Sequence, residues 1–152
     1  MMPLREFVVG KRKTVLSPEE LITEISFREL NDTSWCTFEK VGRRNSLIIA
    51  LVSMAVCLDL ELGSMRIDQI RVALNRVKGK IPERAHNVEK TLTGRILNED
   101  TIAEGLRVLG NDLSLTSDYR ASAEYRVEAA KACLERAVRH CAERITPKGE
   151  QP

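Results

Sequence analysis

The stretch SDYRASAEYR, residues 117–126, gathers the side chains that are best equipped for chemistry in this sequence. It holds two arginines, two acids, two tyrosines and two serines within ten residues. Such a set can build a catalytic cluster, contact the phosphates of a nucleic acid, or begin a helix. A long alanine-rich run with helical spacing follows it, and this favours the start of a helix.

Ser122 can cap this helix with its hydroxyl oxygen, which places Glu124 in the first turn near the positive end of the helix dipole. Two acids flank the two arginines, so ion pairs are expected to fix the start of the helix. We therefore interpret the stretch as a structural motif and not as a catalytic one. Its members are Asp118, Arg120, Ser122, Glu124, Tyr125 and Arg126.

The cysteines show no pattern that is typical of a metal or redox site. The sequence has four of them, without CxxC spacing, and only two histidines. No metal site and no catalytic residue are therefore predicted. Cys133 and Cys141 fit buried small hydrophobes on the last predicted helix, and all four cysteines, Cys36 and Cys57 included, are interpreted as reduced thiols.

The remaining polar residues also carry no recognisable catalytic motif. His86 and His140 fall on separate predicted helices, where surface or capping positions are expected. Two basic clusters, GKRKT (residues 10–14) and GRRN (residues 42–45), stand beside glycines. They can contact a phosphate or an acidic partner surface, or simply form solvated loops. The net charge is only +2, from 24 basic and 22 acidic residues, which argues against nucleic-acid binding.

Length and composition indicate a globular domain. The chain has 152 residues, of which 43% are hydrophobic and 30% are charged. We expect residues 1–146 to form one domain and residues 147–152 to form a flexible tail. The first residues lack the apolar segment of a secretory signal, and the longest apolar run, residues 47–58, is shorter than the roughly 20 residues of a membrane helix. These features predict a cytoplasmic protein without a membrane span.

Strands are predicted in the first half of the chain. Apolar side chains occupy alternate positions over residues 50–62, and again at positions 70, 72 and 74 after Gly63-Ser64. Two alternating runs around a glycine-containing turn predict an antiparallel hairpin. Alternation over residues 21–27 predicts a further strand, and a weaker pattern over residues 36–41 predicts a fourth.

Helices are predicted in the second half. Pro82 suits the first turn of one helix, which Gly94 would end. Asn98 suits the N-cap of a second helix, and Gly110 would end it. The third and longest helix shows a stripe of small and apolar residues from Ala123 to Ile145. Strands followed by helices predict an α+β fold, an antiparallel sheet of three to four strands with the helices packed on one face. The other face must then be polar or covered by a partner.

Five blocks of the sequence resemble one known family, the C-terminal domain of the FAD-binding subunit of molybdenum hydroxylases. This is the xanthine dehydrogenase and carbon monoxide dehydrogenase group. The blocks follow the order of the family and span residue 7 to about residue 144. They are FVVGKRKTVLSPEELITEISF, FEKVGRRNSLIIALVSMAV, RIDQIRVAL, IPERAHNVEKTLTG and SDYRASAEYR. The resemblance implies an antiparallel sheet packed with a three-helix bundle, in agreement with the fold predicted from periodicity.

The resemblance also implies a function that this chain would share with partners. Such flavin subunits pass electrons from iron–sulfur clusters to an external acceptor, and FAD is held mainly by preceding domains whose glycine-rich segments are absent here. A lysine of the FEK block, Lys40 in this sequence, would lie at the flavin edge and stabilise negative charge on the reduced cofactor. The implied partners are the FAD-binding domain, the iron–sulfur subunit and the molybdenum subunit.

Two departures and one alternative accompany the resemblance. Ile48 stands where many members carry a polar residue, often Asp, and NRVKGK, residues 75–80, replaces a turn of small residues. Both departures leave open how the substrate side and the electron-acceptor side of such an enzyme would be built, and neither affects the predicted fold. The alternative function is a non-catalytic interaction module that self-associates, most simply as a homodimer, and does not bind flavin.

Overall fold

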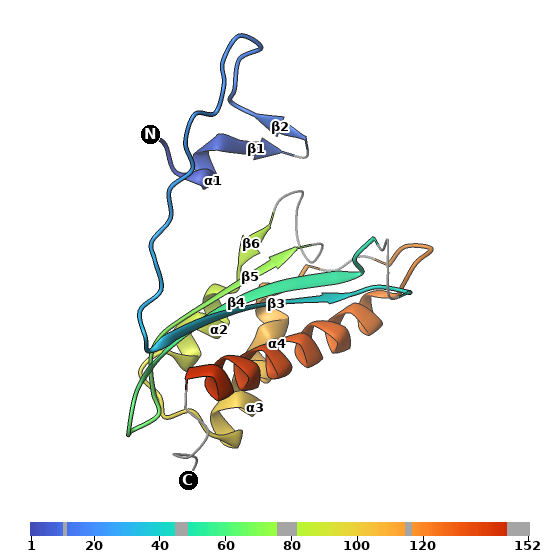
Figure 1. Ribbon diagram of the computed structural model, residues 1–152. Helices are drawn as coiled ribbons and strands as arrows, with labels where there is room; N and C mark the ends of the chain where they lie inside the picture. The colour runs from blue at the N-terminus through green and yellow to red at the C-terminus, as the bar shows by residue number, and fades with distance from the viewer. Residues whose placement is uncertain (11, 45–48, 76–81, 115–116, 146–152) are drawn as a thin grey trace.

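The structure is a computed structural model that describes most of the chain. The described residues are 1–10, 12–44, 49–75, 82–114 and 117–145. Residues 30–145 form a body of sheet and helices, and residues 1–29 form an arm that extends away from it (Figure 1). Ile48, most of the NRVKGK segment and the tail after residue 146 lie outside the described residues.

A four-stranded antiparallel sheet is the centre of the body. Its strands are β3 (Ser34–Val41), β4 (Val52–Glu61), β5 (Arg66–Asn75) and β6 (Glu83–Arg84), in the spatial order β3-β4-β5-β6. The predicted hairpin is confirmed as β4 and β5, and the weaker fourth strand is confirmed as β3. Gly63 adopts φ +89° in the turn between β4 and β5, a left-handed conformation that glycine adopts without steric cost.

The alternation along β4 separates the two faces of the sheet. Its five even-numbered apolar side chains are each 0–1% exposed and point into the core: Val52, Met54, Val56, Leu58 and Leu60. Ile70, Val72 and Leu74 continue this inner face on β5. Successive side chains of a strand point to opposite faces, so the odd-numbered residues of β4 form the outer face.

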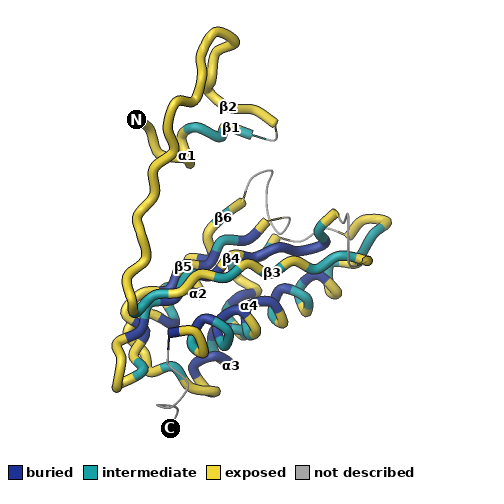
Figure 2. The backbone as a smooth tube through the Cα atoms, in the orientation of Figure 1, coloured by how far each residue is buried: buried dark blue, intermediate teal, exposed yellow. Residues whose placement is uncertain are grey.

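Three helices cover the inner face, as the sequence predicted. They are α2 (His86–Leu92), α3 (Glu99–Leu109) and α4 (Ala123–Ile145). α4 packs along β3 and β4, α2 packs on β5, and α3 packs against the other two helices (Figure 1). Buried residues concentrate between this layer and the sheet (Figure 2). The predicted α+β class is therefore confirmed. None of the described helices is long and apolar enough to cross a membrane.

The ends of α3 follow local sequence signals, with one difference. Asn98 caps the helix as predicted, because its Oδ1 accepts a hydrogen bond of 2.8 Å from the Thr101 N–H. The α-helix ends at Leu109, but Gly110 keeps right-handed helical angles and opens a 3₁₀ turn, Gly110–Asp112. Asp112 of this turn accepts backbone hydrogen bonds from the start of α2, which lacks a capping side chain of its own.

The prediction that Pro82 begins a helix is wrong. Residues 83–84 form strand β6 and pair with β5, and α2 begins only at His86. The Ala85 N–H donates to the Val72 carbonyl and extends this pairing by one residue. Backbone hydrogen bonding to a neighbouring strand thus overrides the local preference of proline for a first helical turn.

The strand predicted over residues 21–27 is also wrong. The arm contains a short helix, α1 (Leu4–Phe7), and a small antiparallel pair, β1 (Val8–Gly10) with β2 (Lys13–Thr14). Beyond this pair, residues 21–27 are extended but pair with no strand. Their apolar side chains are open to solvent, since Leu21, Ile25 and Phe27 are 87%, 79% and 89% exposed.

Candidate functional site

Lys40 lies on the outer face of the sheet, opposite the helices. Its neighbour Glu39 points inward, where its Oε2 accepts a 3.0 Å ion-paired hydrogen bond from Nη2 of Arg136 on α4. The alternation of the strand then directs Lys40 outward, where it is exposed and stands opposite Ser53 of β4. In the part of the chain that the structure describes, the ammonium group of Lys40 forms no ion pair. The sequence placed this lysine on a strand, and the structure adds which face it occupies.

A flat apolar row lies beside Lys40 on the same outer face. Strand register places Phe38 of β3 opposite Ala55 of β4, and Ala55 opposite Ala73 of β5. Phe38 is 63% exposed, and the two alanines beside it project only methyl groups from the sheet. An aromatic ring, two methyl groups and an ammonium group thus form one surface. Such a surface is suited to the edge of a planar, partly anionic ring system.

Cys36 and Cys57 form the next row along this face. They stand directly opposite each other on β3 and β4, and the structure joins them as a disulfide. The interpretation of all four cysteines as reduced thiols is therefore wrong for this pair, because antiparallel register brings together two residues that are 21 positions apart. Cys133 and Cys141 are free and buried, as expected.

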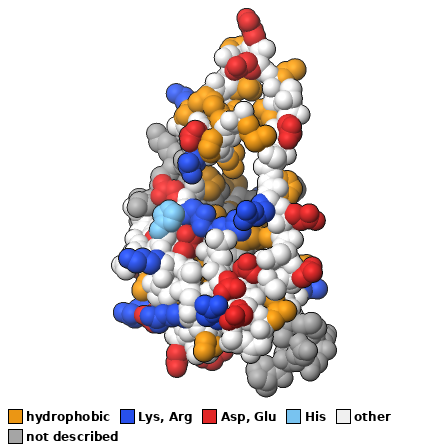
Figure 3. Space-filling model, turned by 90° about the vertical axis from the view of Figure 1, so that its left-hand side faces the viewer, with side chains coloured by type: hydrophobic (Ala, Val, Ile, Leu, Met, Phe, Trp, Pro, Cys, Tyr) orange, Lys and Arg blue, Asp and Glu red, His pale blue; other side chains and the backbone are white. Residues whose placement is uncertain are grey.

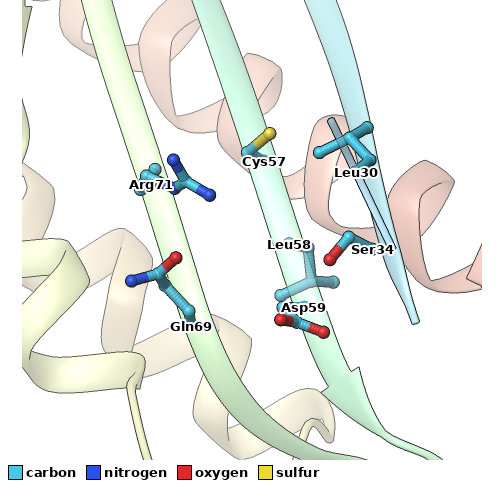
Figure 4. Close-up of a pocket in the computed structure, with 7 residues that line it drawn as sticks. All are labelled: Leu30, Ser34, Cys57, Leu58, Asp59, Gln69 and Arg71. Carbon is cyan, nitrogen blue, oxygen red and sulfur yellow. The ribbon is translucent and has the colours of Figure 1, made fainter. Parts of the chain in front are cut away.

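A small crevice adjoins this cysteine row, with room for about one water molecule. Figure 4 shows Cys57 between Arg71 of β5 and Leu30, the first residue of the body, with Asp59 further along β4. The Asp59 carboxylate accepts a 2.7 Å hydrogen bond from the Thr33 hydroxyl.

Arg126 is the buried centre of the SDYRASAEYR motif. Only 3% of the residue is exposed, and its Nη1 donates a 2.7 Å hydrogen bond to the Leu51 carbonyl just before β4. Its Nη2 donates to Oδ1 of Asp118 at 2.7 Å. The guanidinium group therefore links the start of α4 to the beginning of the central strand β4. Among the described buried side chains, only its Nε lacks a hydrogen-bond partner.

Asp118 organises the loop before α4. Its Oδ1 accepts from the N–H groups of Arg120 and Ala121, and the Arg120 bond is the main cause that holds the pKa of Asp118 below its ordinary value. The Arg120 guanidinium also lies 3.8 Å from the second carboxylate oxygen. The ion pairs expected here therefore form with Asp118, while Glu124 makes none with either arginine.

The other members of the motif take the local positions that the sequence suggests. The Ser122 hydroxyl accepts from the Tyr125 N–H at 3.2 Å, which is an N-cap contact. Glu124 lies in the first turn of α4, and Tyr125 is half exposed. The Ser117 hydroxyl accepts from the Ala123 N–H at 2.9 Å and so adds a second side-chain contact at this helix end. Together these bonds hold the loop against the body.

Two motifs that are far apart in the sequence meet in a basic basin of about 210 Å³. Arg43 and Arg44 come from the GRRN cluster that follows β3, and Tyr119 and Arg120 come from the loop before α4. The Arg120 guanidinium lies 4.7 Å from the centre of the Tyr119 ring. Three guanidinium groups over apolar side chains can receive an anionic group. The GKRKT cluster, by contrast, belongs to the arm.

The histidines lie outside this face. His86 is the first residue of α2, with a largely exposed side chain whose Nδ1 lies 3.3 Å from a carboxylate oxygen of Glu89. His140 is on α4 and partly buried. Neither lines the basin or the cysteine crevice.

Sequence reasoning missed the flat row, the cysteine pair and the basin, because each joins residues from separate elements. Counting outward from the β4–β5 hairpin gives the pairing only as far as Leu60 with Ile67, because the register shifts by one residue between Asp59 and Leu60. The register of β3 against β4 has no comparable signal, since the connection between them is long and carries no hairpin turn sequence.

A comparison with protein families decides the identity of the fold. The family described as the CO dehydrogenase flavoprotein C-terminal domain matches residues 37–141. The chain belongs to this family. The match confirms the resemblance found in the sequence and covers most of β3, the rest of the sheet and nearly all of the helical layer.

Curated relatives of this flavoprotein domain are subunits of dehydrogenases. The chain is 31% identical over 137 residues to the glyceraldehyde dehydrogenase medium chain of Sulfolobus acidocaldarius, covering 90% of this chain and 47% of that protein. It is also 31% identical over 140 residues to the caffeine dehydrogenase subunit beta of Pseudomonas sp., covering 92% of this chain and 46% of that protein. The chain thus spans about half the length of the curated relatives it matches.

Solved structures show the same fold. Carbon monoxide dehydrogenase from Hydrogenophaga pseudoflava superposes with a TM-score of 0.79 at 23% identity, over 92% of this chain and 47% of that chain. Reconstituted CO dehydrogenase from Oligotropha carboxidovorans gives a TM-score of 0.77 at 26% identity, over 92% of this chain and 48% of that chain. These superpositions cover more of the chain than the segment matched by the family.

Proposed function

We propose that this chain completes the flavin site of a molybdenum-hydroxylase-type oxidoreductase and docks the partners between which electrons pass. FAD itself, when bound, supplies the electron-transfer chemistry. The chain contributes the surface against which the flavin part is closed, with Lys40 at the isoalloxazine edge. By itself the chain carries no catalytic centre in this proposal.

The outer face of the sheet is the observation that supports this role. Lys40 presents a positive charge that has no ion-pair partner among the described residues, and the Phe38–Ala55–Ala73 row provides flat apolar surface next to it. This combination fits a flavin edge, which is planar and gains negative charge on reduction. Lys40 and Phe38 are the residues that would contact the cofactor.

The arm supports docking to a larger assembly. Its exposed apolar side chains include Leu21, Ile25 and Phe27. Hydrophobic side chains also gather in the upper part of the molecule in Figure 3. Contiguous apolar surface of this kind marks contacts with other proteins or domains. We place the FAD-binding part there and on the outer face, with the iron–sulfur and molybdenum subunits as further partners. Two relatives carry the names of dehydrogenase subunits, a medium chain and a subunit beta, which supports a partner-dependent role.

Reconstitution tests the proposal. The full chain, mixed at micromolar concentration with its cognate FAD-binding part and FAD, should give a stable flavoprotein. Lys40→Met should weaken FAD binding about ten-fold, the loss expected for one charge-assisted contact. Lys90→Met, which removes an exposed lysine of α2 on the helical side, should leave binding unchanged. Flavin fluorescence titrations measure both, and equal affinities for the two variants would contradict the role of Lys40.

Self-association remains the second function, because the same exposed Phe38 and arm could meet a second copy. Sedimentation of the full chain separates the two functions. A stable homodimer that ignores FAD and the FAD-binding part would replace the flavin-site proposal. A monomer that joins the FAD-binding part would support it.

A further inference from the structure

The Cys36–Cys57 disulfide joins two residues that strand pairing already holds side by side, so the sheet does not need it to align them. The two residues are opposite each other in a ladder of eight paired positions between β3 and β4, and their Cα atoms are 4.1 Å apart. This separation is typical of a pair whose residues exchange no backbone hydrogen bonds. The ladder itself already aligns both residues, so the pair stays aligned whether or not the sulfur atoms are bonded.

The pair is also reachable from solvent. Cys36 is exposed and Cys57 is partly buried beside the crevice. The other two cysteines, Cys133 and Cys141, are 0% exposed, and burial raises the pKa of both thiols, that of Cys141 to about 12. Since the thiolate is the reacting form, a reagent from solvent meets only the first pair.

The charges around the pair favour a reactive thiolate at Cys57. Arg71 stands directly opposite Cys57 on β5 and lines the same crevice. A guanidinium group beside a thiol stabilises the thiolate. The neighbouring acid on this face, Asp59, opposes this effect, because its carboxylate keeps its negative charge while it accepts the hydrogen bond from the Thr33 hydroxyl.

We propose that Cys36 and Cys57 form a reversible thiol–disulfide site on the outer face, which exchanges with low-molecular-weight disulfides such as oxidised glutathione. The exposed Cys36 thiolate attacks the small disulfide, forms a mixed disulfide and releases the first small thiol. The Cys57 thiolate then attacks the Cys36 sulfur, closes the protein disulfide and releases the second small thiol. Two cysteine thiols lose two electrons and two protons in total, and one small disulfide becomes two thiols. The proposal does not depend on flavin binding and concerns the chain while its outer face is free of the FAD-binding part.

Equilibration of the full chain in glutathione buffers tests the site. After rapid alkylation, intact mass should show a two-electron transition at an intermediate ratio of reduced to oxidised glutathione. Peptide mapping should show one link, between Cys36 and Cys57, and alkylation after unfolding should find Cys133 and Cys141 as thiols. A pair that stays fully reduced in oxidised glutathione, or fully oxidised in excess reduced glutathione, would overturn the proposal. A link that involves a buried cysteine would overturn it as well.

Substitutions assign the two steps. Cys57→Ser should accumulate the mixed disulfide on Cys36, whereas Cys36→Ser should react at least ten-fold more slowly, and Cys133→Ser should behave like the wild type. Arg71→Gln should slow closure roughly three-fold, while the exposed control Arg107→Gln on α3 should not change it. If Cys57→Ser gives no mixed disulfide, the order of attack is wrong and the site is not the one proposed. The wild-type transition remains a test that needs no variant to fold.

Discussion

The arm and the strand β4 carry the same sequence pattern and end in opposite environments. Both alternate apolar side chains with period two, over residues 21–27 and residues 52–61. Leu58 of β4 is 1% exposed, but Leu21 of the arm is 87% exposed. The difference lies in neighbours, since β4 is paired on both sides and the arm segment is paired on neither. Alternation therefore shows that a segment can be half buried, and pairing decides whether it is.

The arm also differs from the body in its hydrogen bonds. Bonds within the arm include the Val15 N–H to the Phe7 carbonyl at 3.0 Å and the Glu20 N–H to the Ser17 carbonyl at 3.1 Å. These are local contacts, whereas the body is held by long-range ladders and by Arg126. Side-chain changes in the arm should therefore leave the unfolding of the body almost unchanged, while the same changes in the body should not.

The largest expected change in the free energy of unfolding comes from comparing a buried leucine of the body with an exposed leucine of the arm. Leu58→Ala should lower the free energy of unfolding by about 2–5 kcal/mol, because it removes a fully buried side chain and leaves a cavity. Leu21→Ala should change it by less than about 0.5 kcal/mol, since that side chain is already in water. Urea denaturation measures both. A large loss for Leu21→Ala would show that the arm packs on the body in solution.

The next largest stability difference is expected between a buried arginine of the body and an exposed arginine of the arm. Arg126→Met removes the hydrogen-bond partner of the Leu51 carbonyl and one of the partners of the Asp118 carboxylate, and should cost roughly 2–3 kcal/mol. Arg5→Met in the arm removes only an exposed contact with Glu6, at 3.6 Å, and should cost less than about 0.5 kcal/mol. Thermal and urea unfolding measure the two changes, and equal losses would remove Arg126 as the anchor of α4.

A smaller effect is expected where a side chain caps backbone N–H groups. Asn98→Ala removes the N-cap of α3 and should cost about 1 kcal/mol. Thr14→Ala removes the comparable contact in the arm, where the Leu16 N–H donates to the Thr14 hydroxyl at 3.4 Å, and should be silent in the same unfolding curve. If both substitutions were silent, packing and not capping would hold the start of α3.

Acid should weaken a carboxylate contact of the body and have no comparable effect through the arm. Hydrogen bonding, first from the Arg120 N–H, lowers the pKa of Asp118 below its ordinary 3.8, so its stabilisation is complete above that pH and is lost as pH falls through the lower folded value. Asp118→Asn should therefore be less stable than the wild type at neutral pH, and the gap should close in acid.

Glu20 of the arm provides the control for this pH dependence. Its pKa is also lowered, mainly by the Ser17 N–H, but that contact belongs to a local turn. Glu20→Gln should leave the pH dependence of body unfolding unchanged. A gap that persists in acid for Asp118→Asn would mean that the carboxylate charge is not the stabilising element.

Much of the fold was predictable from local signals. The alternation of β4 and β5, the Asn98 cap and the stripe of α4 all follow from short-range physical preferences, and the resemblance of ordered blocks identified the family. The failures at residues 21–27 and at Pro82 have one cause. Each depends on whether another strand is present to receive backbone hydrogen bonds, and local sequence does not contain that information.

In the candidate site, too, local sequence determined some features and tertiary structure determined others. The sequence by itself determined which residues carry charge, thiol and aromatic groups, and it determined that Lys40 lies on a strand. Only the tertiary structure decided that Lys40 shares a face with Phe38 and that Cys36 meets Cys57. It also joined the GRRN cluster to the loop before α4. For the sheet residues the physical reason is register, because a shift of β3 by one residue against β4 would send Lys40, Phe38 and Cys36 to the other face.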